Sequence, residues 1–283
     1  HYGLRVDLLI VSMSKRMDQH TARVAHISDT LVKARQSRHI LPGFPGELPF
    51  SLEEAYQVQD RSIDLWEDEV VAWKVGGIPP HLRAVLGQDW VTGPIYSKRQ
   101  AFVADGPVRM AVFDGGFAAV EAEIVLELGD VSNLKTATPT ADDIIPFISA
   151  CYIGVEIASS PMPDINVIGP LAVISDFGNN HGMIVGRKIE DWSPEKLSSI
   201  EVKTYVEHEL VGAANPPAPP AGPMGAAAFL VGNLIRRGQP IPPGLRISSG
   251  ALTGIHDVTV GQHSKVVFDG VGEIDIEIVA LDE

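Results

Sequence analysis

The sequence predicts an α+β protein in which a helical N-terminal region, residues 17–100, precedes a β-rich core, residues 101–283. Two observations support this division. Apolar residues recur at helical spacing in the first third of the chain, and short strand-like segments follow one another after residue 101. We interpret the two parts as one functional unit. Residues 1–16 are set aside as an extension or a cloning remnant.

The first expected helix covers residues 21–40. It places Val24, Ile27 and Leu31 on one face, as an amphipathic helix against a core would. The Pro- and Gly-rich segment 41–46 should end it.

A second helix is expected over residues 51–68, because Ser51 and Glu54 have the spacing of a capping box. A strand over residues 70–75 should follow, then a glycine turn and a short helix from Pro80.

Two helices are expected to interrupt the β-rich core, over residues 140–148 and 223–237, and Gly238 should end the second. The clearest strand is the last one. Over residues 273–278, isoleucine alternates with acidic residues, which predicts one buried and one solvated face.

The composition excludes several classes of protein. A net charge of −14 argues against a nucleic-acid partner, and no apolar run reaches the roughly 18 residues of a membrane span. The single cysteine, Cys151, cannot form an internal disulfide, and its apolar neighbours predict a buried core position. We therefore expect a cytoplasmic protein without nucleic-acid or membrane partners.

Two acidic residues share one strand face in the segment 120–125. Side chains two residues apart on a strand project together, which places Glu121 and Glu123 roughly 7 Å apart. Such carboxylates repel each other unless water or a cation intervenes. A solvated strand face explains the pair equally simply, and Glu127 on the same side favours that alternative for the pair alone.

Glu156 shifts the interpretation from a solvated strand face toward a cation site, because it lies in an apolar, strand-like segment over residues 152–158. A buried carboxylate is costly unless it is paired or binds a metal. An ion pair with a distant Lys or Arg explains Glu156 as well as a metal does. Three carboxylates together suit a hard cation such as Mg²⁺ or Mn²⁺.

Lys74 is the second polar residue in an apolar segment, over residues 71–77, which ends in two glycines. Beside a metal site it can bind a carboxylate or exchange a proton. A strand lysine whose ammonium group reaches solvent is the alternative.

A polar turn over residues 175–181 precedes the next apolar strand. Loops of this kind often carry function, but Asp, Gly and Asn are also common turn residues. A lone histidine such as His181 is more often structural than catalytic.

Six segments together resemble the 2-keto-4-pentenoate hydratase and 2-oxo acid decarboxylase group of the fumarylacetoacetate hydrolase superfamily. Their order and spacing carry the resemblance, which spans residues 20–283. The segments are AYQVQ (55–59), WKVG (73–76), VEAEI (120–124), GVEI (154–157), LIRRG (234–238) and SGALT (249–253).

The resemblance implies a mixed β-roll core of the fumarylacetoacetate hydrolase type. It also implies Mg²⁺ or Mn²⁺ as the cofactor and a small 2-oxo acid as the substrate. The residues that it implies are Glu121, Glu123 and Glu156 as metal ligands, Lys74, Asp176 and Asn179 as catalytic residues, and Gly76, His181 and Thr253 as substrate-binding residues.

The chain departs from the hydratase pattern at two places. Hydratases tend to carry an acidic residue before a Phe-Gly pair, where this chain has WVTG (90–93) with Asp89 as the nearest carboxylate. They also tend to carry Asp-Asn-Ala-Ser, where this chain has DFGN (176–179). Both departures concern residues expected to face the substrate.

The resemblance therefore implies a metal-dependent lyase that adds water to a 2-hydroxy-dienoate or 2-oxo-enoate. A 2-oxo acid decarboxylase or an acylpyruvate hydrolase on the same scaffold is the alternative, and a ligand-binding member without turnover is a further one. A homo-oligomer and a role in the catabolism of aromatic compounds are also expected from the resemblance.

Overall fold

The computed structural model describes residues 2–281, with side chains described over residues 15–281. The helices are α1 (Tyr2–Ser37), α2 (Leu52–Leu65), α3 (Pro80–Leu86), α4 (Ala141–Ile144), α5 (Ile165–Ile168), α6 (Pro170–Ser175), α7 (Pro194–Ser199) and α8 (Gly222–Arg237), with 3-10 turns η1 (Ser97–Arg99), η2 (Ile145–Phe147) and η3 (Phe177–Asn179). The strands are β1 (Val70–Gly77), β2 (Trp90–Tyr96), β3 (Gln100–Phe102), β4 (Val108–Val112), β5 (Phe117–Leu128), β6 (Ile148–Ser160), β7 (Asn180–Lys188), β8 (Val202–Val206), β9 (Glu209–Ala214), β10 (Arg246–Ser248), β11 (His256–Asp257), β12 (His263–Phe268) and β13 (Gly272–Ala280).

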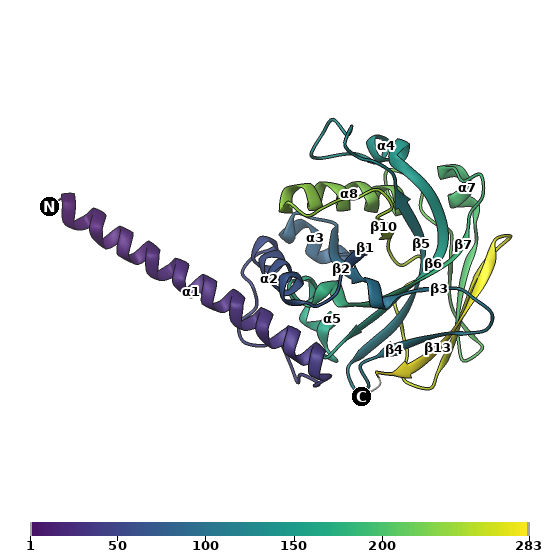
Figure 1. The fold of residues 1–283 in the computed structure, drawn as a ribbon, viewed down its shortest axis with the longest axis horizontal. Helices are drawn as coiled ribbons and strands as arrows, with labels where there is room; N and C mark the ends of the chain where they lie inside the picture. The colour runs from purple at the N-terminus through teal and green to yellow at the C-terminus, as the bar shows by residue number, and fades with distance from the viewer. Residues whose placement is uncertain (1, 282–283) are drawn as a thin grey trace.

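The strands form two mixed sheets that pack face to face (Figure 1). The larger sheet has the order β2-β1-β10-β5-β6-β7-β3, with β11 paired to β5. The smaller one has the order β4-β13-β12-β8-β9. In Figure 1, β5 and β6 curve between the strand β13 on one side and the helices α2, α3 and α8 on the other. This curled arrangement confirms the predicted α+β fold with a β-roll core.

The larger sheet draws strands from both parts of the chain. β1 and β2 belong to residues 17–100, yet β1 pairs in parallel with β10, which in turn pairs with β5. The sheet therefore continues across the boundary at residue 100, and this brings Lys74 of β1 toward the glutamates of β5.

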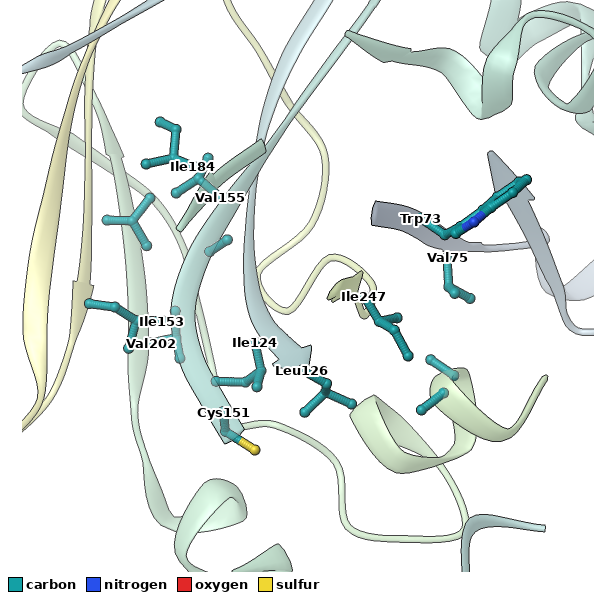
Figure 2. Packing of buried hydrophobic residues seen from close by; sticks show 14 of the residues in the cluster. Trp73, Val75, Ile124, Leu126, Cys151, Ile153, Val155, Ile184, Val202 and Ile247 are labelled. Carbon is teal, nitrogen blue, oxygen red and sulfur yellow. The ribbon is translucent and has the colours of Figure 1, made fainter. Parts of the chain in front are cut away.

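Buried apolar side chains form one continuous cluster on one face of the curled larger sheet (Figure 2). On this face Val155 and Ile184 lie toward the smaller sheet, whereas Trp73 and Ile247 lie toward α8. The opposite face carries a second buried cluster that includes Val125. Cys151 belongs to the first of these clusters, which confirms the expected core position. A sheet covered on both faces can hold a polar centre away from bulk water.

Helix α1 is longer than the segment 21–40 that the sequence predicted. It begins at Tyr2 and is continuous through residues that we had set aside as an extension. It projects from the body as a long rod (Figure 1). Its C-terminal part packs as expected, because Val24, Ile27 and Leu31 are buried against residues of α2, α5 and α6. None of the described helices is long and apolar enough to cross a membrane.

Helix α2 begins with the predicted cap. Ser51 Oγ accepts a hydrogen bond of 3.1 Å from the backbone N–H of Glu54, while the Glu54 carboxylate accepts from the backbone N–H of Phe50. The helix ends at Leu65, three residues before the predicted end at residue 68. It stops there because Trp66 leaves the helix to pack its ring against Tyr96 and Phe177.

The later elements lie close to their predicted positions. The segment 140–148 folds as α4 followed by η2, and Pro146 is the second residue of this 3-10 turn. Helix α8 ends where Gly238 adopts a left-handed φ of 67°. In β13 the isoleucines at 274, 276 and 278 are fully buried, as the alternation predicted.

Candidate metal centre

Three glutamates meet on the face of β5 and β6 that is turned away from the smaller sheet. Glu121 lies directly opposite Glu156 in the antiparallel pairing, and Glu123 lies opposite Gly154. Each glutamate offers an oxygen within 4.8 Å of the oxygens of the other two. Glu121 is 4% exposed, and Glu123 and Glu156 are fully buried, which excludes the solvated strand face.

Gly154 allows the strands to pack closely beside this centre. A Cβ at that position would lie 2.4 Å from Val125 Cγ2 and 3.0 Å from the carbonyl oxygen of Ile184. Any side chain there would push β5, β6 and β7 apart, and it would displace Glu123, which pairs with Gly154. The glycine in the segment 154–157 therefore has a packing role at the centre.

The cluster carries more negative than positive charge. Burial, and then repulsion by Glu156, raises the pKa of Glu121 to about 8. Burial, followed by the charges of Glu156 and Glu121, raises the pKa of Glu123 well above its ordinary value. Within the described residues, Glu123 Oε1 and Glu156 Oε2 are buried without a hydrogen-bond partner. Unpartnered buried oxygens indicate that a cation belongs here.

Lys74 supplies one positive charge to the cluster. Its Nζ lies 3.2 Å from Glu156 Oε1 and donates a hydrogen bond of 3.0 Å to the carbonyl oxygen of Gly178. Burial alone would lower the pKa of Lys74, but the attraction of the three glutamates outweighs it and raises this pKa. The ammonium group is buried and does not reach solvent. One lysine cannot neutralise three carboxylates.

Gly76 leaves room for the lysine. A Cβ on Gly76 would lie 3.2 Å from Lys74 Nζ, closer than a side chain usually approaches a polar head group. The backbone of Lys74 is also held by Thr92, whose Oγ1 donates a hydrogen bond of 2.7 Å to the carbonyl oxygen of Lys74. Thr92, one of the departures from the hydratase pattern, therefore fixes the backbone of β1.

Two residues that the sequence did not single out hold the glutamates in place. Ser248 Oγ donates a hydrogen bond to Glu123 Oε2, and Asn180 Nδ2 donates to Glu156 Oε1 at 3.1 Å. Each lies next to a residue already singled out, since Ser248 precedes the segment 249–253 and Asn180 follows Asn179. Their positions in the sequence did not reveal which way their side chains point.

A cavity of about 850 Å³ opens onto this centre, a size typical of small-molecule sites. It divides the predicted site residues into two groups. The predicted residues in its wall are Lys74, Gly76, Glu121 and Asn179. The predicted residues outside its wall are Glu123, Glu156, Asp176, His181 and Thr253.

Asp176 lies behind the cavity in a buried ion pair with Arg35 of α1. Arg35 Nε donates to Asp176 Oδ1 at 2.5 Å, and Arg35 Nη2 donates to Oδ2 at 2.9 Å. Ser160 Oγ donates to Oδ2 at 2.6 Å. Arg35 also donates to the carbonyl oxygens of Asn180 and Ser159. Each Asp176 oxygen therefore has a partner, and the carboxylate does not face the cavity.

The loop after Asp176 has an unusual backbone. Phe177, Gly178 and Asn179 have successive φ values of 53°, 67° and 62°, and only glycine adopts such values without strain. The loop also packs tightly on β2, because a Cβ on Gly93 would lie 2.1 Å from the carbonyl oxygen of Phe177. The second departure from the hydratase pattern thus forms a tightly held turn that presents Asn179 to the cavity.

His181 and Thr253 contact protein groups behind the cavity wall. The His181 ring packs on Phe113, with centroids 4.7 Å apart. Its pKa lies well below the ordinary value because the ring is buried and because Arg99 and Arg35 repel its protonated form. Thr253 Oγ1 lies 2.8 Å from Thr204 Oγ1 and 3.1 Å from a ring nitrogen of His256.

Comparison with known proteins agrees with the resemblance that the six sequence segments carry. No family model matches the chain. The chain is 27% identical over 233 residues to 2-keto-4-pentenoate hydratase 1 of Dechloromonas aromatica (strain RCB), which covers 78% of this chain and 84% of the relative. It is 24% identical over 283 residues to 4-oxalocrotonate decarboxylase of Pseudomonas putida, covering 93% and 97%.

A solved structure supports the fold. It is a 4-oxalocrotonate decarboxylase from Pseudomonas putida G7, complexed with magnesium and adipate, and its TM-score with this chain is 0.73 at 22% identity. The match covers 92% of this chain and 98% of the other. At this identity the likeness shows the fold.

The three glutamates fit a hard divalent cation. They supply only carboxylate oxygens, which Mg²⁺ and Mn²⁺ prefer, and two of these oxygens have no other partner among the described residues. A cation would also offset the burial of charge and the repulsion by Glu156, which together raise the pKa of Glu121. Because Glu121 lies in the cavity wall, a cation held there would be accessible to a small ligand.

Proposed function

This chain is a homologue of the 2-keto-4-pentenoate hydratases and of 4-oxalocrotonate decarboxylase in the fumarylacetoacetate hydrolase superfamily, and from that premise we propose that it is a divalent-metal-dependent lyase. Its proposed reaction is the addition of water to a 2-hydroxy-dienoate or 2-oxo-enoate. The proposal rests mainly on a buried cluster in which three carboxylates face a single ammonium group, beside a cavity of about 850 Å³. The cluster consists of Glu121, Glu123, Glu156 and Lys74.

Glu121, Glu123 and Glu156 would hold the cation. When bound, it would supply Lewis-acid stabilisation of negative charge that develops on the oxygens of a 2-oxo acid. Ser248 orients the Glu123 carboxylate through its hydrogen bond, and Asn180 orients Glu156. Such outer partners keep ligand oxygens in place and are typically worth about 10–100-fold in metal affinity or activity.

Lys74 is the group best placed to bind the substrate carboxylate or to exchange a proton. Lys74 lies in the cavity wall, and its Nζ donates a hydrogen bond to the carbonyl oxygen of Gly178, which lines the same cavity. Asn179 lies in the same wall, and its buried Oδ1 has no hydrogen-bond partner among the described residues. This oxygen is available to accept a hydrogen bond from a hydroxyl group or a water molecule in the cavity.

Part of the cavity wall is apolar. Apolar side chains, including those of Val91, Val173 and Leu252, line the cavity together with Trp90. Apolar walls lower the local dielectric constant, which strengthens the electrostatic effect of Lys74 on a bound anion.

Decarboxylation of a 2-oxo acid is the second candidate reaction. The 4-oxalocrotonate decarboxylase of Pseudomonas putida matches 93% of this chain, compared with 78% for the hydratase. The two departures from the hydratase pattern also lie at the site, where Gly93 and the turn 177–179 pack together. Hydration remains the first proposal because the centre is the same for both reactions and the identity to the hydratase is slightly higher.

A panel of 2-oxo acids incubated with purified protein and Mg²⁺ tests the proposal. Loss of dienol absorbance without CO₂ means hydration, and CO₂ release means decarboxylation. Two smaller acids among the products would mean hydrolysis of a carbon–carbon bond. Binding without turnover of any compound would contradict a lyase and favour a ligand-binding protein. The Glu123→Gln variant serves as the background control.

The proposal extends to the location, the assembly and the metabolic role of the protein, and to three residues outside the cavity wall. We propose that the protein is cytoplasmic, that it assembles as a homo-oligomer and that it serves the catabolism of aromatic compounds. We also propose that Asp176 and His181 act by positioning the turn 177–179, and that Thr253 acts by fixing the loop that contributes Leu252 to the cavity wall. Light scattering of the purified protein tests the oligomer.

A further inference from the structure

Two of the six quoted segments, AYQVQ (55–59) and LIRRG (234–238), contribute no residue to the described wall of the cavity. They meet where Arg237 Nη2 donates a hydrogen bond of 2.8 Å to Gln59 Oε1. We propose that Gln59, oriented by Arg237, is a positioning residue for Lys74. This inference rests on the proposed function, because it assumes that Lys74 takes part in the reaction.

The contact with Arg237 fixes which way the Gln59 amide points. A guanidinium group only donates, so its partner must be the amide oxygen. The amide nitrogen then faces the other way, and it donates two hydrogen bonds of 2.8 Å, to the carbonyl oxygens of Thr92 and Ile174. Gln59 is fully buried, so a reversed amide would leave these groups without water to replace the lost bonds.

Arg237 is itself held firmly between α8 and α2. Its side chain is 7% exposed and forms an ion pair with Asp60. Its Nη1 donates to Asn233 Oδ1 at 3.0 Å, and its guanidinium carbon lies 4.5 Å from the centroid of the Tyr56 ring. These contacts use the polar edges and one face of the group, so Arg237 offers Gln59 a fixed anchor.

The two acceptors of Gln59 belong to the two elements that hold Lys74. Thr92 lies in β2, and its Oγ1 donates to the backbone carbonyl of Lys74. Ile174 lies in α6, which leads into the turn whose Gly178 carbonyl accepts a hydrogen bond from Lys74 Nζ. One buried amide therefore ties together the elements that fix the backbone and the ammonium group of Lys74. Its loss should displace Nζ without removing any group from the centre.

A double-mutant cycle of Gln59→Leu and Lys74→Met tests the positioning role. The readout is the single-turnover rate at saturating Mg²⁺, with 2-hydroxypenta-2,4-dienoate as the probe or, if another acid of the panel reacts faster, that acid. Gln59→Leu should lower the wild-type rate about 10–100-fold, the scale of a small displacement of a reacting group. In the Lys74→Met background the further loss should stay below about twofold, because the group that Gln59 positions is absent.

Two further variants separate positioning from the stability of α2. Gln59→Glu keeps the size and the acceptor for Arg237 but removes both donors, so it should show the same pattern and serves if the leucine variant does not fold. Ser62→Ala is the matched control in the same helix. Its buried hydroxyl bonds to Ser28 and not to β2 or α6, so its loss should lower the melting temperature and leave the rate within about twofold.

The possible failures have different meanings. Equal losses from Gln59→Leu in both backgrounds would overturn the positioning role alone, as would unchanged rates in both Gln59 variants. A rate loss of the same size in Ser62→Ala would mean a general weakening of α2 and would also overturn it. A wild-type rate in Lys74→Met would remove Lys74 from the reaction, and the positioning role with it. Wild-type protein that turns over no acid of the panel would overturn the proposed function itself.

Discussion

Two buried ion pairs lie on opposite sides of the turn 177–179, and they differ in how completely they are satisfied. In the pair of Arg35 and Asp176, both carboxylate oxygens accept hydrogen bonds, and the guanidinium group also donates to backbone carbonyls. In the pair of Lys74 and Glu156, one ammonium group faces a cluster of three glutamates with two unpartnered oxygens.

The difference separates a structural pair from a functional one. Burial of charge costs free energy, and complete hydrogen bonding is what offsets this cost in a structural pair. The pair of Arg35 and Asp176 meets this condition with protein groups alone. The cluster around Lys74 does not meet it, and a bound cation would offset the remaining negative charge. Four changes in these pairs or beside them test the comparison.

The largest expected effect is that of Glu123→Gln. The change removes one charged ligand but keeps the size of the side chain. We expect Mg²⁺-dependent turnover to be abolished and Mg²⁺ affinity to fall at least about 100-fold, beyond the usual loss for an outer-shell partner. The melting temperature in chelator should hold or rise, because repulsion with Glu121 and Glu156 is relieved. Full activity in this variant would remove the metal centre from the proposal.

Arg35→Met should have the largest effect on stability. It leaves Asp176 buried without its cation, which typically costs about 3–5 kcal/mol. Denaturant unfolding in chelator measures the loss. The double change Arg35→Met with Asp176→Asn should recover part of it, because no uncompensated charge remains. An equal loss in the single and double variants would mean that packing of Arg35, and not its charge, stabilises α1.

Lys74→Met should affect rate far more than stability. It keeps the aliphatic stem and removes the ammonium group that contacts Glu156. A role in proton exchange predicts a loss of roughly 100-fold or more in kcat, the usual scale for general acid–base catalysis. Single-turnover kinetics and thermal melting, measured on the same preparation, separate the two effects. Turnover close to that of the wild type would show that Lys74 only balances charge.

The smallest expected effect is a pH dependence at the structural pair. His181 has a folded-state pKa well below its ordinary value of about 6.5. The unfolded chain therefore takes up a proton first as the pH falls, and the contribution of His181 to stability is present above about pH 6.5 and is lost below it.

Unfolding free energies at pH 7.5 and 5.5, measured in chelator, check this dependence. The difference between wild type and His181→Gln should shrink by about 1 kcal/mol between the two values, since one pH unit corresponds to about 1.4 kcal/mol for one proton. A difference that stays constant with pH would mean that His181 titrates normally in the folded protein.

The clustering of the three glutamates could be predicted from the sequence because their strands are regular. The period of two places Glu121 and Glu123 on one face, and the apolar neighbours of Glu156 indicate its burial. The direct opposition of Glu121 and Glu156 depends on the register of two strands, which local patterns do not contain.

The supporting residues were harder to predict, because they act across long sequence separations. Arg35 lies 141 residues before Asp176, and Ser248 lies 125 residues after Glu123. An arginine at the end of an amphipathic helix gives no local indication of a buried partner. Asp176 was expected among the catalytic residues because the family resemblance implied it. The structure turns it toward Arg35 because that is where its charge is offset.

The direct opposition of Glu121 and Glu156 has a consequence for how the chain folds. β5 and β6 are buried on both faces, so the usual contrast between an apolar and a polar face cannot align them. A slip by one residue would turn one set of glutamates into the apolar layer between the two sheets, where an unpaired carboxylate costs several kcal/mol. The same acidic side chains that prepare the site for a cation thus penalise a one-residue misalignment of the two longest strands during folding.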